Sequence, residues 1–404
     1  MLTHLHRPAG RALAALAFTA AVVTPTPAQQ QQQTSELPSW RLPGWTFTPG
    51  VIFGALYDTN ATVSSPDVNR STPSDRMFRV QPFGQLEYFS PRTTFEGSYQ
   101  GSLRRYMDLS GLDGTDHNAY LSVRERVSRR VTLFANDNYS QVPSTDQLNL
   151  GGVPFQLGGA RYNAMAAGVE ARLTRSVDLA ARYEMTWVDF LRKDTLLTGG
   201  MVNGVHGELT RRLTERASVG AEYGTRWADL NEGTRQLSFQ DGGAVFHYRT
   251  GEATTFDASA GVAHLLDRNS RVARTGPYAK LGLTHTARRA TFELDYSRSY
   301  VPSLAFGGTN QSQEARASVR MPLRENRFYL QESAAWRRTD PFVASEIGLD
   351  SIFLDTVLGY AVQKWFRIEG YHSFTTQDNR LAAGQISRHV VGVQFVVSEP
   401  VRIR

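Results

Sequence analysis

The sequence predicts an all-β fold, a transmembrane antiparallel up-and-down β-barrel of about 18 strands. Segments from Trp45 to about Val397 alternate apolar and polar side chains, and the breaks between them are alternately short and long. Aromatic residues stand at both ends of the apolar faces. A closed sheet in a membrane needs this pattern, because every second side chain meets lipid and the others meet the lumen.

The first residues predict the compartment. Arg7 and Arg11 precede an apolar run from Ala12 to Val23, which leads to Thr26-Pro27-Ala28. This pattern is typical of a secretory signal peptide, which we assign to residues 1–28. Residues 29–44 then form a polar, glutamine-rich periplasmic lead, residues 45–397 the barrel and residues 398–404 a short tail. We therefore expect an exported, integral protein of the bacterial outer membrane.

Composition alone would suggest a soluble protein, since the 404 residues are 41% hydrophobic and the mean hydropathy is −0.36. A wide barrel explains these values, because only half of its strand residues face lipid. The chain has no cysteine. Disulfides, thiolate metal sites and a lipidated cysteine are therefore excluded.

The first strand shows the alternation clearly. Phe47, Phe53 and Tyr57 share one face, while Thr48 and Asp58 share the other. The segments at 95–104, 177–187 and 217–227 repeat the pattern. Two interfacial girdles follow from the aromatic positions: Tyr57, Tyr139, Trp187, Trp227 and Trp336 at one rim, and Tyr88, Tyr360 and Trp365 with Phe95 and Phe256 at the other.

The connections give the strand count and the orientation. Short turns are expected near Pro91, Arg129, Thr174, Thr214, Gly251, Arg288, Glu325 and Gln363. Longer loops are expected around Ser64, Leu112, Asn149, Thr195, Asn231, Arg271, Gly307, Ala344 and Asn379. Short turns of such barrels are periplasmic and long loops extracellular, so an even strand number puts both termini in the periplasm. About 18 strands leave room for an aqueous lumen.

Charged residues recur on the predicted inner face. They are Glu96, Arg104, Arg124, Arg126, Arg182, Glu184, Glu222, Arg226, Arg316 and Arg320. One interpretation is an anion-preferring path, since all but three of the 44 basic residues are arginine, which binds carboxylate, sulfate or phosphate bidentately. The other is a set of cross-strand ion pairs that stiffen the wall. The 38 acidic residues favour the second.

Arginine doublets lie at the short turns, as at Arg129-Arg130, Arg211-Arg212 and Arg288-Arg289. They could hold lipid headgroups or a periplasmic partner, but solvated turns that resist aggregation are the simpler interpretation. The partners expected are outer-membrane lipids and lipopolysaccharide. No nucleic acid is needed to explain these charges.

Two loops are unusually apolar. One contains Val142-Pro143-Ser144 followed by leucines, glycines and Phe155, and the other contains Val301-Pro302-Ser303 followed by Leu304 and Phe306. Apolar residues in an extracellular loop need cover. The segments therefore either fold into the pore, with glycines forming tight bends, or pack on each other above the rim. The sequence leaves both arrangements open and favours the second.

Neither catalysis nor a bound cofactor is predicted. The histidines at 117, 206, 247, 264, 285, 372 and 389 are scattered, and none belongs to a serine, histidine and acid arrangement. Asp108, Asp113 and Asp116 lack the spacing of a calcium loop, so we expect a polar turn there. We assign no catalytic residue, no metal ligand and no cofactor.

Short motifs carry a resemblance to a family. They are Tyr57-Asp58-Thr59-Asn60, Ser74-Asp75, the strand from Tyr99 to Tyr106, and Asp137-Asn138-Tyr139-Ser140. Over most of the mature chain these resemble the outer-membrane β-barrels associated with exopolysaccharide loci, including the PEP-CTERM-associated and porin-2-like groups. The resemblance implies an outer-membrane step in polysaccharide export, with a polysaccharide chain and periplasmic export proteins as partners.

Three functions therefore remain open for a monomeric or trimeric barrel. The resemblance implies an exopolysaccharide export channel. Barrel size alone predicts a general or anion-preferring porin for small solutes. The apolar loops would also permit a structural or adhesive barrel that binds a ligand outside the cell.

Overall fold

The computed structural model describes residues 43–403 except 66–71, 149, 151, 193–196, 232, 270, 288, 305–307, 324–326, 343–347 and 380–383. The expected signal peptide and nearly all of the polar lead lie outside these residues. No helix among the described residues is long and apolar enough to span a bilayer.

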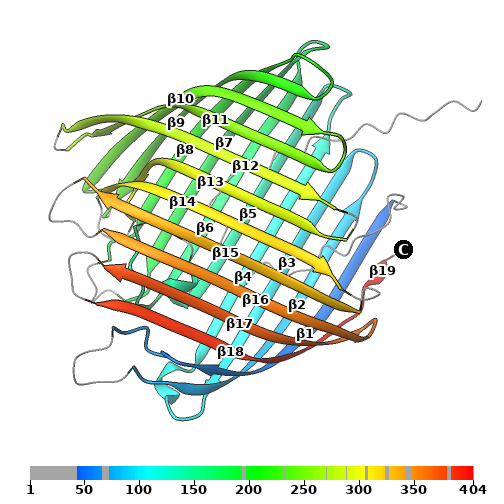
Figure 1. The fold of residues 1–404 in the computed structure, drawn as a ribbon, viewed down its shortest axis with the longest axis vertical. Coiled ribbons are helices and arrows are strands. Elements are labelled where there is room, and N and C mark those ends of the chain that lie inside the picture. The colour runs from blue at the N-terminus through cyan, green and yellow to red at the C-terminus, as the bar shows by residue number, and fades with distance from the viewer. Residues whose placement is uncertain are drawn as a thin grey trace, which may run out of the picture.

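Eighteen strands form the wall (Figure 1). They are β1 (Gly44–Asp58), β2 (Asp75–Phe89), β3 (Thr93–Tyr106), β4 (Gly114–Arg126), β5 (Val131–Ser144), β6 (Leu157–Arg172), β7 (Val177–Phe190), β8 (Gly200–Arg212), β9 (Ala217–Leu230), β10 (Arg235–Thr250), β11 (Thr254–Asp267), β12 (Ala273–Thr286), β13 (Thr291–Pro302), β14 (Thr309–Pro322), β15 (Phe328–Pro341), β16 (Leu349–Gln363), β17 (Phe366–Asn379) and β18 (Gln385–Ser398). Two short 3-10 helices, η1 (Ser110–Leu112) and η2 (Thr145–Gln147), lie in loops.

Pairing between the first and last strands closes the sheet. Each strand pairs antiparallel with the next, and β1 pairs with both β2 and β18, so that Phe53 lies opposite Val80 and Phe395. The predicted antiparallel barrel of about 18 strands is confirmed. The connections also fall where the sequence places them, including the short turns at 90–92 and 364–365. The connections at 231–234 and 268–272, predicted to be longer loops, are as short as the turns at 173–176 and 323–327, so the prediction of their length is wrong.

The chain continues to pair after β18. Residues Val401–Ile403 form β19, which pairs antiparallel with Trp45–Phe47 at the start of β1. Residues 401–403 of the predicted tail are therefore part of the sheet edge rather than a separate segment.

The outer surface is apolar, as lipid requires. Side chains that point outward include Phe53, Phe78, Tyr99 and Leu103, each between 46% and 55% exposed. Their neighbours along the strands point inward, since β1 ends with Leu56 and Asp58 buried on either side of the exposed Tyr57. A closed barrel with an apolar outer face is the architecture of integral outer-membrane proteins.

Hydroxyl residues form several of the short turns. Ser90, Ser128, Thr174 and Thr214 each accept hydrogen bonds from the backbone N–H groups two and three residues later. Such side chains imitate a backbone acceptor and fix tight turns. The repeated geometry explains why the strands keep their register with so few connecting residues.

Candidate functional site

The loop between β5 and β6 enters the mouth of the barrel. Its apolar side chains are buried, with Leu148 at 2%, Val153 at 2% and Phe155 at 4% exposure. Gly152 supplies a bend with φ +71°, and an added Cβ would lie 2.3 Å from Asn310 Nδ2. The structure therefore places the described part of this loop, residues 145–148, 150 and 152–156, inside the barrel.

Contacts with distant strands hold this loop across the lumen. The backbone N–H of Phe155 donates to Gln377 Oε1 of β17 at 2.7 Å, and Gln377 Nε2 donates to the carbonyl of Val153 at 3.3 Å. The Phe155 ring packs edge-on against Phe353 of β16, with 5.4 Å between centroids. The loop therefore runs from β5 and β6 to the wall formed by β16 and β17.

A buried ion-pair triad ties the other end of the loop to the wall. Arg388 of β18 donates to Asp146 Oδ2 at 2.7 Å and to Asp58 Oδ2 of β1 at 2.6 Å. The three side chains are 6%, 4% and 0% exposed. Tyr106 donates a further hydrogen bond to Asp58 at 3.3 Å. Removing one partner of such a group leaves a buried charge uncompensated, so the triad is a strong anchor.

The second apolar loop packs against the first. Ser303 Oγ donates to the carbonyl of Gly152 at 3.2 Å, and the carbonyl of Leu304 accepts from the N–H of Gly199 at 3.0 Å. Arg226 donates to the carbonyl of Tyr300 at 3.1 Å. Both sequence-based arrangements are thus realised in part: the β5–β6 loop enters the lumen, and the two loops also contact each other.

These loops fill one side of the lumen. Leu148, Leu150, Val153 and Leu304 of the loops form an apolar cluster with inward side chains of β5 to β13, among them Tyr162, Leu230 and Phe239, each at most 1% exposed. Close packing of this kind leaves little room for solutes.

The opposite side of the lumen holds a cavity of about 150 Å³. It is lined by β1 to β4, by β16 to β18 and by Asp146 and Gln147 of the inserted loop. Its basic residues are Arg79, Arg104, Arg367 and Arg388, and its aromatic residues are Phe83, Tyr106, Phe353 and Tyr371. A solute that crosses this side of the lumen meets both charge and aromatic surface.

Arg79 is the exceptional charge in this cavity. It lies directly opposite Arg104 across β2 and β3, and Arg104 Nε is 2.9 Å from Asp116 Oδ2. Arg79 makes no salt bridge among the described residues, although the carboxylate of Asp116 attracts it electrostatically. Its guanidinium lies 5.7 Å from the ring centroid of Tyr371, and its Nε is buried without a hydrogen bond. Arg79 therefore differs from Arg104, which pairs directly with Asp116.

Most of the predicted lumen charges pair with neighbours. Arg124 donates to both oxygens of Glu170 at 2.7 and 2.8 Å, Arg226 lies 3.3 Å from Asp241, and Arg182 pairs with Glu184. Arg316 pairs with Glu314, which also binds Arg337 at 3.0 Å.

Weaker contacts involve the remaining predicted charges. Glu96 accepts from Gln85 and Arg320 donates to Gln331, both at 3.5 Å, and Glu222 contacts His206 at 3.2 Å. Arg126 is exposed at the short-turn end of β4. The ion-pair interpretation therefore describes much of the predicted set of lumen charges. Alternation alone did not identify Arg79 or Arg388 as lumen charges of particular importance.

The predicted girdle residues lie near the strand ends. Tyr57, Trp227, Trp336 and Trp365 are between 36% and 48% exposed. At the opposite rim the rings pack in pairs, Tyr88 on Trp45 and Tyr360 on Phe328, with centroids 4.7 and 4.6 Å apart. Tyr139 and Trp187 are partly exposed on β5 and β7.

Protein donors already occupy two of the aspartates near η1, Asp113 and Asp116. Arg105 and the backbone N–H of Tyr106 donate to Asp113 at 2.7 and 2.8 Å, and these hydrogen bonds hold the pKa of Asp113 below its usual value. Asp116 pairs with Arg104. The polar-turn interpretation accounts for these contacts.

Comparison with known proteins finds similarity only to solved structures. No family model matches the chain, and no curated protein does. The resemblance to barrels of exopolysaccharide loci gains no support from these comparisons.

Three solved structures illustrate the similarity. OccAB4 of Acinetobacter baumannii is 11% identical with a TM-score of 0.45, covering 90% of this chain and 100% of that one. The outer membrane protein OpdK from Pseudomonas aeruginosa is 13% identical with a TM-score of 0.43, covering 88% and 99%. OpdQ of the same organism is 10% identical with a TM-score of 0.40, covering 89% and 98%. The strand pairing described above, rather than these matches, establishes the fold.

Proposed function

We propose that this chain is an outer-membrane channel for small hydrophilic solutes, with a preference for anions. The observation that carries the proposal is the lumen cavity of about 150 Å³, bounded by the inserted loop and containing Arg79, which makes no salt bridge among the described residues and whose Nε is buried without a hydrogen bond. A fixed positive charge in a narrow, partly desolvated passage raises the local concentration of anions. The neighbouring arginines contribute less, because carboxylates compensate them.

Ion selectivity in planar lipid bilayers tests the proposal. Under a KCl gradient, the reversal potential of the purified barrel should indicate preference for chloride, and Arg79→Gln should move it toward the nonselective value. Arg105→Gln is the matched control, since this arginine is on the adjacent strand with 78% of its side chain exposed outside the lumen. Equal reversal potentials for the wild type, Arg79→Gln and Arg105→Gln would refute the role of Arg79 in anion selectivity. Absence of conductance in the wild type would refute the proposal that the barrel is a channel.

Polysaccharide export, which the resemblance implies, is the second candidate. The inserted loop and its buried triad argue against it in this conformation, because a polymer would have to displace both. A deletion strain separates the candidates. Loss of surface polysaccharide with periplasmic accumulation would favour export, whereas normal polysaccharide with slower uptake of small anions would favour the solute channel.

A further inference from the structure

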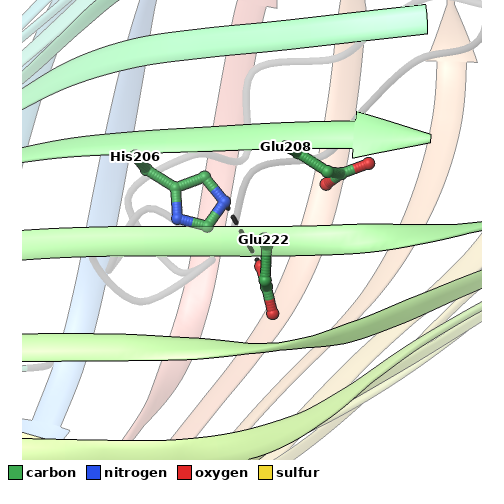
Figure 2. Close-up of side chains that lie close together, drawn as sticks. All are labelled: His206, Glu208 and Glu222. Atoms are coloured by element: carbon green, nitrogen blue, oxygen red, sulfur yellow. Dashed lines mark ion pairs between the residues drawn. The ribbon is translucent and has the colours of Figure 1, made fainter. Parts of the chain in front are cut away.

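A second polar cluster lies on the wall formed by β8 and β9, outside the cavity of Arg79. His206 and Glu208 are two residues apart on β8 and therefore share its inward face, and Glu222 lies directly opposite Glu208 on β9 (Figure 2). One nitrogen or oxygen atom from each side chain lies within 4.8 Å of the others. Two strands thus bring one imidazole and two carboxylates together.

The two glutamates require a positive charge between or beside them. Like charges directly opposite each other on neighbouring strands destabilise a sheet, and burial increases that cost. The side chains of Glu222 and Glu208 are 4% and 11% exposed. His206 Nε2 lies 3.2 Å from Glu222 Oε2, and His247 Nε2 lies 3.0 Å from Glu208 Oε1. Each carboxylate therefore has one imidazole as a neighbour.

One ligand atom of this cluster remains without a hydrogen bond. Oε1 of Glu222 is buried without a hydrogen bond of ordinary geometry among the described residues, and so are the hydroxyl groups of Ser259 and Tyr278, both of which interact with Glu222. Buried polar atoms are nearly always satisfied, and an exception indicates a missing water or ion. A cation beside this atom would supply the missing contact.

Neighbouring residues support the cluster. Gly224 lies opposite His206, and an added Cβ would come within 3.2 Å of His206 Nδ1 and 2.8 Å of Asp241 Oδ2, so a side chain there would crowd the imidazole. Asp257 Oδ1 lies 2.6 Å from Nδ1 of His247, which fixes the ring that contacts Glu208. Carboxylate and histidine contacts of this kind commonly orient the ligands of a metal.

We propose that His206, Glu208 and Glu222 bind a divalent transition-metal cation from the lumen. One imidazole nitrogen with two carboxylate oxygens suits Zn²⁺ and its neighbours in the first transition series, whereas Mg²⁺ and Ca²⁺ prefer oxygen ligands alone. The cation would join β8 to β9 and cancel the repulsion of the opposed glutamates. Lys280 interacts electrostatically with Glu222 and opposes the binding, so its charge limits the affinity.

Metal titration of the purified, chelator-stripped barrel tests this site. Zn²⁺ should bind with one equivalent per chain by calorimetry and elemental analysis, and Mg²⁺ should not compete with it. His206→Ala and Glu222→Gln should each lower the Zn²⁺ affinity at least about tenfold. Lys280→Gln should raise it, because a competing positive charge is removed.

His264→Ala is the matched control. This histidine is on β11 and hydrogen-bonds Thr275 at an exposed position, so its replacement should leave Zn²⁺ binding unchanged. Heat-modifiable gel migration verifies that each variant is folded. Absence of stoichiometric Zn²⁺ binding to the folded wild type, or equal affinity in His206→Ala and His264→Ala, would overturn the proposal.

Discussion

The two sides of the lumen differ although one loop contributes to both. On the side of β5 to β12, Leu148, Leu150 and Val153 of the loop join an apolar cluster. On the side of β16 to β18 and β1 to β4, Asp146 and Gln147 of the same loop border a polar cavity. The difference shows how a wide barrel becomes a narrow one: apolar packing fixes the loop on one side, and the polar remainder of the loop borders the cavity on the other.

The largest expected effect is at the triad that ties the loop to the wall. Arg388→Gln should lower the free energy of unfolding by about 3–5 kcal/mol, because Asp58 and Asp146 remain buried without their cation. Urea unfolding in detergent micelles, followed by tryptophan fluorescence, measures it. Arg105→Gln should change stability by no more than about 0.5 kcal/mol. Equal stability of these two variants would show that the triad does not anchor the loop.

A smaller loss is expected on the filled side. Leu230 is 0% exposed, so Leu230→Ala should cost about 3 kcal/mol through the cavity it leaves. Leu281→Ala is the control, since this leucine is 46% exposed on the outer face. Because buried apolar side chains fill this side of the lumen, the ion selectivity of Leu230→Ala should equal that of the wild type. A shifted ion selectivity would mean that ions pass on the side of the apolar cluster, which contradicts the account.

The smallest effect is expected in the paired wall charges. Arg124 and Glu170 are 34% and 23% exposed, so a double-mutant cycle of Arg124→Gln and Glu170→Gln should give a coupling energy below about 1 kcal/mol. The reversal potential of Arg124→Gln should shift far less than that of Arg79→Gln. A comparable shift would mean that paired arginines also shape the path.

Alternation was sufficient to predict the wall. A period of two assigns Phe53 and Tyr57 to lipid and Asp58 to the lumen, and the turn spacing gives the strand number. Both signals are local, so they need no knowledge of distant contacts. The position of the apolar loop was not predictable in the same way. Its composition shows that it needs cover but does not identify the surface that covers it.

The charged contacts required long-range information. Arg388 meets Asp58 and Asp146 across 330 and 242 residues of sequence. Alternation placed Arg104 and Arg124 on the inner face, but the carboxylates beside them depend on strand register and side-chain length. Arg79 shares its inward face with Gln81 and Gln85, which is the one sequence signal that could have identified it. That it makes no salt bridge among the described residues is visible only in three dimensions.

Single-channel conductance of a loop-shortened variant tests the central claim most directly. Replacing residues 147–155 with a short Gly-Ser linker removes the segment that separates the filled side from the cavity. We expect conductance to rise at least about twofold in planar bilayers, with weaker preference for chloride, because the lumen of an 18-stranded barrel then opens. Conductance and selectivity equal to those of the wild type would contradict the claim that this loop bounds the path.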